Sequence, residues 1–152
     1  MIAVIQRVKE ASVYTGGELF SNIGNGLLVF LGIHKSDSEE DSRILAKKII
    51  DLRIFSDEND KMNLSLRDIG GEALIISQFT LCTDNGKSGN RPSFINAELP
   101  ERAEKLYILH IEEMKLSYDS KKIKNGAFGE NMQIKLCNDG PVTIILQRNI
   151  NT

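Results

Sequence analysis

Short runs rich in apolar and branched residues, separated by glycine and polar residues, predict β-strands along most of this chain. The run at residues 27–33 is apolar on both faces, which is typical of a buried central strand. Gly16-Gly17 lies between two such runs and predicts a hairpin turn. The other strands are expected over residues 2–8, 11–15, 18–23, 72–81, 132–138 and 142–148, with a further short one at Ile123.

Two segments have helical periodicity instead. Asp37 is expected to cap the first helix, because Glu40 follows three residues later in a capping-box pattern. Pro100 suits the first turn of the second helix. The residues that recur at helical spacing, and so should face the core, are Leu45, Ile49 and Leu52 in the first helix, and Ala103, Leu106, Tyr107, His110, Ile111 and Met114 in the second.

Seven or so strands with two helices that do not alternate regularly indicate an α+β fold. The expected architecture is a curved, largely antiparallel, barrel-like sheet with two helices packed on one side. A length of 152 residues suits one domain covering residues 1–152.

Composition and charge narrow the class of protein. The longest apolar run is too short to cross a bilayer, and the first residues resemble a strand rather than a secretory signal. Cys82 and Cys137 are the only cysteines, which fits reduced thiols in a cytoplasmic protein. A net charge of −2 argues against wrapping a long nucleic acid. It permits contact with one RNA end through a local patch, either Lys87 with Arg91 or the group Lys115, Lys121, Lys122 and Lys124.

Several familiar kinds of site are not indicated by the sequence. No HExxH, CxxC or clustered His/Cys spacing is present, so no metal site is expected. The glycine-rich motifs of dinucleotide and P-loop sites are absent, and no cofactor is expected. His110 lies on an apolar helical stripe and is interpreted as a packed core histidine, and His34 as a loop residue.

Polar residues end an otherwise apolar strand at Ser77, Gln78 and Thr80. Buried polar side chains need hydrogen-bond partners, so this cluster is either a capped strand end or a site. A strand end also leaves backbone N–H groups pointing outward, where they can stabilise a developing oxyanion.

Gly140-Pro141 lies between two expected strands. Proline cannot donate to a sheet ladder, so Pro141 must start a strand, occupy an edge or leave the sheet. A simple turn would satisfy this pattern equally well.

Two motifs together resemble those of the D-aminoacyl-tRNA deacylases (the D-tyrosyl-tRNA deacylase family). They are Ser77-Gln78-Phe79-Thr80-Leu81 and Asn138-Asp139-Gly140-Pro141-Val142-Thr143. The similarity extends over nearly the whole chain, from Met1 to about Arg148. Each motif alone is moderately specific, whereas both in this order are strongly specific.

This resemblance implies a hydrolase that cleaves the ester between a D-amino acid and the 3′-terminal adenosine of tRNA. It implies a cytoplasmic homodimer in which a cis Gly140-Pro141 reaches into the partner's active site, with the aminoacyl-tRNA 3′ end as substrate. The implied catalytic residues are Ser77, Gln78, Phe79 and Thr80, and those implied to bind substrate are Gly140, Pro141, Phe128, Gly129 and Met132.

The chemistry leaves two roles open for Thr80. Its hydroxyl is a candidate nucleophile, but no general base is identifiable in the neighbouring sequence. Alternatively, Thr80 and Gln78 position the ester while water or the vicinal ribose hydroxyl assists. Two other classes of function also remain open at this stage: a non-catalytic RNA-end or protein-binding module, and an esterase acting on small molecules.

Overall fold

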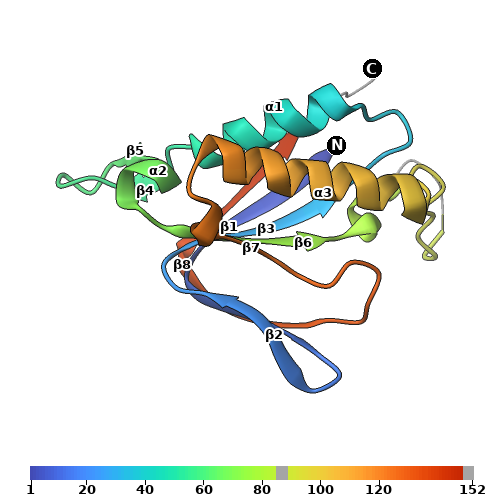
Figure 1. Ribbon diagram of the computed structural model, residues 1–152, viewed down its shortest axis with the longest axis horizontal. Helices are drawn as coiled ribbons and strands as arrows, with labels where there is room; N and C mark the ends of the chain where they lie inside the picture. The colour runs from blue at the N-terminus through green and yellow to red at the C-terminus, as the bar shows by residue number, and fades with distance from the viewer. Residues whose placement is uncertain (85–88, 149–152) are drawn as a thin grey trace.

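The computed structural model describes residues 1–84 and 89–148 (Figure 1). Strands and helices follow each other irregularly, which confirms the expected α+β class. In chain order the elements are β1 (Ile2–Thr15), β2 (Glu18–Ile23), β3 (Gly26–Gly32), α1 (Glu39–Ile50), β4 (Phe55–Ser56), β5 (Met62–Leu64), α2 (Leu66–Ile69), β6 (Glu72–Ser77), the 3-10 turn η1 (Phe79–Cys82), α3 (Pro100–Ser117), the 3-10 turn η2 (Ser120–Lys122), β7 (Ile123–Asn125) and β8 (Gln133–Gln147).

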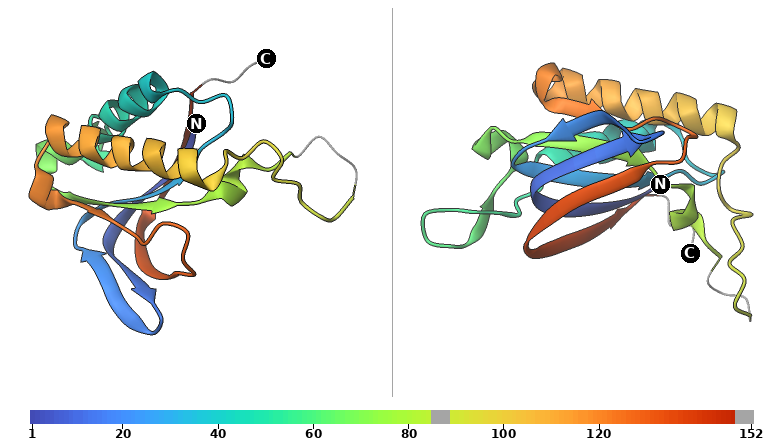
Figure 2. Two further views of the ribbon diagram at one scale, coloured as in Figure 1. Left: turned by 45° about the vertical axis from the view of Figure 1, so that its right-hand side comes forward. Right: turned by 90° about the horizontal axis from the view of Figure 1, so that it is seen from below.

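One six-stranded sheet has the order β2-β1-β3-β6-β7, with β8 pairing along β1. β1 is a single long strand rather than the two expected segments. Its first half pairs with β3 and its second half with β2, both antiparallel, so it bends from one partner to the next (Figure 2). β8 is antiparallel to β1, whereas β3–β6 and β6–β7 are parallel. The curved, largely antiparallel sheet is therefore as predicted, with a parallel portion at β3, β6 and β7.

The helices α1 and α3 lie side by side over one face of the sheet, as expected (Figures 1 and 2). Ser42 Oγ donates to Leu106 O at 3.0 Å, and His110 Nδ1 lies 3.2 Å from Ser42 O, so polar contacts link the two helices inside the core. His110 is fully buried, which confirms its interpretation as a core residue. The four-residue helix α2 was not predicted, because one turn is too short to produce a period. None of the helices in the described part of the chain is long and apolar enough to span a membrane.

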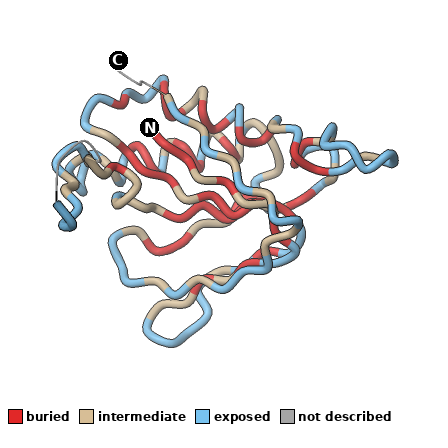
Figure 3. Tube along the Cα trace, turned by 180° about the vertical axis from the view of Figure 1, so that it is seen from behind, coloured by how far each residue is buried: buried red, intermediate tan, exposed pale blue. Residues whose placement is uncertain are grey.

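Buried residues are concentrated along the central strands (Figure 3), and they form two clusters, one on each face of the sheet. The larger lies beneath α1 and α3, and the smaller lies on the opposite face around Val8, Leu28 and Leu74. Residues of β3 enter both clusters, because successive side chains point to opposite faces of a strand. This confirms the buried central strand expected at residues 27–33.

The cap of α1 differs from the prediction. Ser38 is the N-cap: its Oγ accepts from Asp41 N at 3.2 Å, and the Asp41 carboxylate accepts from Ser38 N at 2.9 Å. Asp37 is buried instead, where its carboxylate accepts from His34 N at 2.7 Å and pairs with the amino group of Met1. A buried carboxylate needs such partners, whereas serine caps a helix as well as aspartate does.

The strand expected over residues 72–81 ends earlier, at Ser77. Ser77 makes the last pair with β3, at Leu31, and β3 itself ends at Gly32. Without a partner strand the ladder stops, and the chain turns into η1.

Candidate active site

A cavity of about 630 Å³ opens where β3 and β6 end. Because these strands are parallel, their carboxyl ends meet at one edge of the sheet, and that edge forms the cavity floor. The floor residues are Leu31, Ile33, Ile76, Ser77 and Gln78. The walls come from the start of α3 and from residues 128–134, so three separate parts of the chain enclose one space.

The η1 turn presents main-chain donors at this edge. Gln78 N donates to Leu31 O at 2.8 Å, which attaches the start of the turn to β3, and Leu81 N donates to Gln78 O at 3.3 Å. A 3-10 helix joins residue i to residue i+3, so the N–H groups of Phe79 and Thr80 have no acceptor within the turn. These two adjacent amides could stabilise an oxyanion.

Thr80 is held by its neighbour. Gln78 Nε2 donates to Thr80 Oγ1 at 2.5 Å, and both side chains are partly buried. In this contact the glutamine amide is the donor, and an amide is not a base that could remove the hydroxyl proton. The hydrogen bond therefore orients Thr80 without activating it as a nucleophile. Ser77, Gln78 and Phe79 line the cavity, whereas Thr80 lies next to it in the same turn.

Glu98 also lines the cavity but is already paired. It accepts from Leu99 N at 2.8 Å and from Arg102. Despite the opposing effect of partial burial, these hydrogen bonds and the Arg102 charge hold the pKa of the Glu98 carboxyl below its usual range. A carboxylate that is so bound is a poor general base.

Cys82, the last residue of η1, is fully buried beneath the turn. Burial, assisted by the nearby Asp37 carboxylate, raises the pKa of the Cys82 thiol to about 11. The nucleophilic form of cysteine is the thiolate, so Cys82 is a packing residue at neutral pH.

Phe128, Gly129 and Met132 also line the cavity, and their implied role in binding substrate stays a prediction. The Phe128 ring packs against Tyr107 of α3, with ring centroids 5.5 Å apart. Tyr107 is fixed in turn, because its hydroxyl donates to Ile75 O at 2.7 Å. An aromatic ring held in this way suits stacking with a base.

The sequence interpretation missed part of the wall. Leu99, Pro100 and Ala103 from the start of α3 line the cavity, and Phe94 stands at its mouth against Phe79. The two rings meet edge to face, with centroids 5.3 Å apart, and the Phe79 side chain is 60% exposed. The sequence places Pro100 and Ala103 in the second helix, and no local pattern distinguishes any of these residues as cavity walls.

Gly140-Pro141 lies elsewhere, in a bulge of β8. Between the pairs Gln6–Thr143 and Val8–Asn138, β1 advances by two residues whereas β8 advances by five. Residues 139–142 therefore protrude from the ladder; we call this segment the bulge. β8 pairs only with β1 among the described strands, so Pro141 occupies an edge strand and a bulge, two positions that tolerate proline. Its peptide bond to Gly140 is cis, and both residues are exposed.

Arg7 of β1 anchors the bulge. Its Nε donates to Asp139 O at 3.0 Å and its Nη1 donates to Ile54 O at 2.8 Å. The Asp139 carboxylate also lies 3.6 Å from Arg7 Nε and 3.4 Å from Lys9 Nζ. Gly140 has φ +134, and a Cβ there would lie 3.0 Å from Arg7 Nη2. The guanidinium thus fits closely against a residue without a side chain.

The two signature motifs do not meet within one chain. Arg7 pairs with Leu27, whereas the start of η1 bonds to Leu31, which pairs with Ala3. Four residues along a strand correspond to roughly 13 Å. The bulge and the η1 turn therefore lie near opposite ends of β3.

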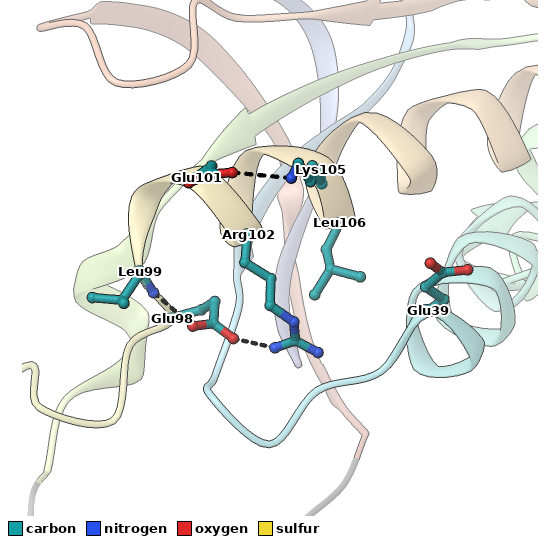
Figure 4. A pocket seen from close by; sticks show the side chains of 7 residues that line it. All are labelled: Glu39, Glu98, Leu99, Glu101, Arg102, Lys105 and Leu106. Atoms are coloured by element: carbon teal, nitrogen blue, oxygen red, sulfur yellow. Dashed lines mark hydrogen bonds and ion pairs between the residues drawn. The ribbon is translucent and has the colours of Figure 1, made fainter.

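A second cavity, of about 440 Å³, lies between the starts of α1 and α3 (Figure 4). Its basic side chains are already paired, Arg102 with Glu98 and Lys105 with Glu101. Arg102 also donates to Asp37 O at 2.7 Å. The ion pair of Glu98 with Arg102 thus helps to fix the wall that the two cavities share.

The remaining sequence candidates are dispersed. Residues 1–84 and 89–148 contain no group of three or more His, Cys, Asp or Glu side chains arranged to hold a metal ion. Of the basic patches, Lys115 pairs with Glu112, and Lys122 donates to Gly70 O. Arg91 is exposed, and Lys87 lies outside the described residues.

The chain is similar in sequence to proteins of known family. The sequence profile of the family described as D-Tyr-tRNA(Tyr) deacylase matches residues 4–147. A D-aminoacyl-tRNA deacylase of Thermodesulfovibrio yellowstonii is 52% identical over 146 residues, which cover 96% of this chain and 98% of the relative. One of Clostridium beijerinckii is 50% identical over 151 residues and covers 99% of both chains.

Two solved structures share the fold. One, described as a c-Myc DNA Unwinding Element Binding Protein, has a TM-score of 0.92 and 43% identity and covers 97% of this chain and 99% of its own. Another, described as a probable eukaryotic D-amino acid tRNA deacylase, has a TM-score of 0.79 at 14% identity, covers 95% and 97% of the two chains, and supports the fold alone. With a profile match over nearly its full length and relatives at 50% identity or more, the chain belongs to the D-Tyr-tRNA(Tyr) deacylase family.

Proposed function

We propose that this protein hydrolyses the ester between a D-amino acid, or glycine, and the 3′-terminal adenosine of tRNA, and that it rejects L-aminoacyl-tRNA through Gly140-Pro141. As a member of the deacylase family it is a hydrolase that acts on D-aminoacyl-tRNA. The observation that carries the finer proposal is the cavity at the end of β6, which is lined both by the η1 turn with its main-chain donors and by the aromatic ring of Phe128.

The amides of Phe79 and Thr80 are proposed to receive the ester carbonyl oxygen. An aminoacyl ester is already activated, so oxyanion stabilisation and orientation suffice for attack by water. Water adds to the carbonyl carbon, the bond to the ribose oxygen breaks, and that oxygen takes a proton, which releases free amino acid and tRNA. Gln78 and Thr80 orient the ester, in keeping with their mutual hydrogen bond.

The terminal adenine is proposed to lie between Phe128 and Met132. A cavity of about 630 Å³ is within the usual range for small-ligand sites, and it has room for a nucleoside together with an aminoacyl group. Stacking on an aromatic ring contributes about 1–3 kcal/mol per base. Adenine binding would place the ribose ester toward the η1 turn.

A partner copy is proposed to complete the site. The bulge of one chain is remote from that chain's own cavity, yet it is exposed at a sheet edge, where a second copy can meet it. In a homodimer, the carbonyls of Gly140 and Pro141 of one copy would accept hydrogen bonds from the substrate's α-amino group in the cavity of the other.

This arrangement would select chirality by exclusion. With the amine and ester both fixed, the α-hydrogen and the side chain are the two substituents that exchange places between enantiomers. A D-side chain points outward, whereas an L-side chain collides with the Gly140-Pro141 backbone. Glycine has no side chain to reject, so glycyl-tRNA should be hydrolysed. Complete inertness toward glycyl-tRNA would count against this filter.

The decisive assay incubates the protein separately with D-tyrosyl-tRNA and L-tyrosyl-tRNA. We expect release of D-tyrosine and retention of the L-ester. Equal rates on both substrates would refute the proposal. Hydrolysis of free D-amino acid esters at a comparable rate would identify a small-molecule esterase instead, and inertness toward all of them would indicate a binding module.

Thr80→Ala separates the two roles of the hydroxyl. Near-wild-type turnover is expected, because the alanine amide still faces the ester. Total loss of activity in a variant that folds and binds tRNA normally would identify Thr80 as the nucleophile.

A further inference from the structure

Two buried glycines stand directly behind the walls of the cavity. Gly32 ends β3 behind the η1 turn, and Gly126 follows β7 behind Met132. Neither has a positive φ, so any residue could adopt the backbone conformation at these positions. Glycine therefore stands at both positions because the neighbouring atoms leave no room for a Cβ.

At Gly32 a Cβ would meet the η1 turn itself. It would lie 3.0 Å from Leu81 Cβ and 3.1 Å from Cys82 Sγ, with Ile2 Cγ2 at 2.9 Å. A Cβ atom such as that of Leu81 is bonded to the main chain and cannot swing away. The turn would have to move by a few tenths of an ångström, and with it the amides of Phe79 and Thr80.

At Gly126 a Cβ would meet only the ends of flexible side chains. Met132 Sδ would lie at 2.7 Å and Ile76 Cδ1 at 2.8 Å. Both residues line the cavity. Gly126 N donates to Ile75 O at 3.0 Å, so its own backbone is fixed by the sheet. The added atom would therefore displace Met132 and Ile76, and the cavity that they line would change shape.

We propose that Gly32 and Gly126 are positioning residues that act on two different parts of the cavity lining, Gly32 on the η1 turn and Gly126 on the side chains of Met132 and Ile76. Gly32 sets the place of the main-chain donors and thereby the rate of ester cleavage. Gly126 leaves room for Met132 and Ile76 in the cavity wall and thereby sets the space for the base and the affinity for the tRNA terminus. This inference rests on the proposed function and adds two residues to its machinery.

Single-turnover deacylation of D-tyrosyl-tRNA with enzyme in excess distinguishes the two effects. Gly32→Ala is expected to lower the rate at saturating enzyme about tenfold or more, since misplacement by 1 Å costs about 100-fold, with little change in the half-saturating concentration. Gly126→Ala is expected to raise the half-saturating concentration about tenfold, as the loss of one stacked base predicts, with little change in the saturated rate.

Gly24→Ala is the matched control. Its Cβ would have one neighbour, Glu72 Oε1, at 3.9 Å, which is an ordinary contact, so both kinetic parameters should stay at their wild-type values. Thermal unfolding of each variant verifies that it is folded. If Gly32→Ala does not fold, Cys82→Val adds bulk to the same contact from the other side and should lower the same rate.

Rescue separates positioning from general disturbance. Adding Ile76→Val to Gly126→Ala removes the Cδ1 atom that the new Cβ would meet at 2.8 Å and leaves Met132 in place, so the double variant should bind more tightly than Gly126→Ala alone. Parallel loss of rate and affinity in both single variants, or no difference from Gly24→Ala, would overturn the inference. If the wild-type protein deacylates nothing, the proposed function fails. Weaker binding of adenosine monophosphate to Gly126→Ala, measured by calorimetry, then still supports the assignment of Gly126, and unchanged binding refutes it.

Discussion

The η1 turn and the bulge both present main chain, but they are held in opposite ways. The turn follows the buried strand β6. Cys82 is buried beneath it, and Gln78 N donates to Leu31 O of β3, so the core and the sheet hold the turn in place. The bulge leaves an edge strand, is exposed at Gly140 and Pro141, and is held by side-chain contacts, of which those of Arg7 reach furthest into the fold. The amides proposed to stabilise the oxyanion thus lie on a turn that the core supports, whereas the segment proposed to reach a partner copy protrudes from an edge strand. The two proposed tasks occupy different parts of the sheet.

The largest expected effect tests the support beneath the turn. Ile75 is fully buried in β6, and Ile75→Ala should lower the free energy of unfolding by about 3 kcal/mol, because it removes apolar contacts and leaves a cavity. Urea denaturation measures this value. Ile108→Ala, at a position 51% exposed on α3, is the control and should change stability by less than about 0.5 kcal/mol. Equal losses of stability in the two variants would contradict the view that the buried strand β6 supports the turn more than the exposed face of α3 does.

A pH titration tests the helix layer over the same core. Burial lowers the pKa of His110 to about 4, against an ordinary value of 6.5. The unfolded chain therefore binds the proton first as the pH falls, so stability should decline between about pH 6.5 and pH 4, by about 3 kcal/mol at most, and no further from this group below pH 4. His110→Asn should flatten that part of the stability curve; an unchanged slope would assign it to other groups.

Arg7→Ala tests the other half of the comparison. It removes the donors to Asp139 O and Ile54 O, so the bulge should lose its fixed position while η1 keeps its own. The preference for D- over L-tyrosyl-tRNA should fall about tenfold, equivalent to about 1.4 kcal/mol. The matched control is Arg53→Ala, since Arg53 donates to Asn63 O at 2.7 Å on a different loop. A variant that retains full discrimination would show that the bulge needs no anchor.

The smallest effect concerns a site remote from both regions. Ser38→Ala removes the N-cap of α1 and should cost about 1 kcal/mol of stability. Deacylation below the unfolding temperature should be unchanged, because the cap touches neither the turn nor the bulge. A selective loss of activity would mean that α1 communicates with the cavity.

The elements with strong local signals could be predicted from the sequence. The apolar run of β3, the stripe of α3 and the polar end of β6 were found because each is set by neighbours within a few residues. The cap moved from Asp37 to Ser38 because Asp37 has a partner at Met1, and such distant pairing leaves no trace in local spacing. The sequence predicts two strands in place of β1 because the pairing that keeps β1 continuous comes from β8, at the other end of the chain.

The candidate site could be predicted only in part. Ser77 and Gln78 stood out as polar residues at an apolar strand end, and the resemblance supplied Phe128 and Met132. Leu99 and Ala103 look like any helix residues, and they become walls only when α3 lies across the sheet. Arg7 is separated by 132 residues from the carbonyl that it holds, so its role is evident only in the fold.

The ladder on either side of the bulge has a further consequence. β1 and β8 stay in register from Ile2 to Gln6 and again from Glu10 to Tyr14, so the protruding residues are framed by pairing that does not depend on their identity. Such a frame can accept a different short segment without a new fold. The proposed selectivity could thus diverge among descendants by exchange of a few residues of the bulge, while the β1–β8 ladder on both sides stays the same.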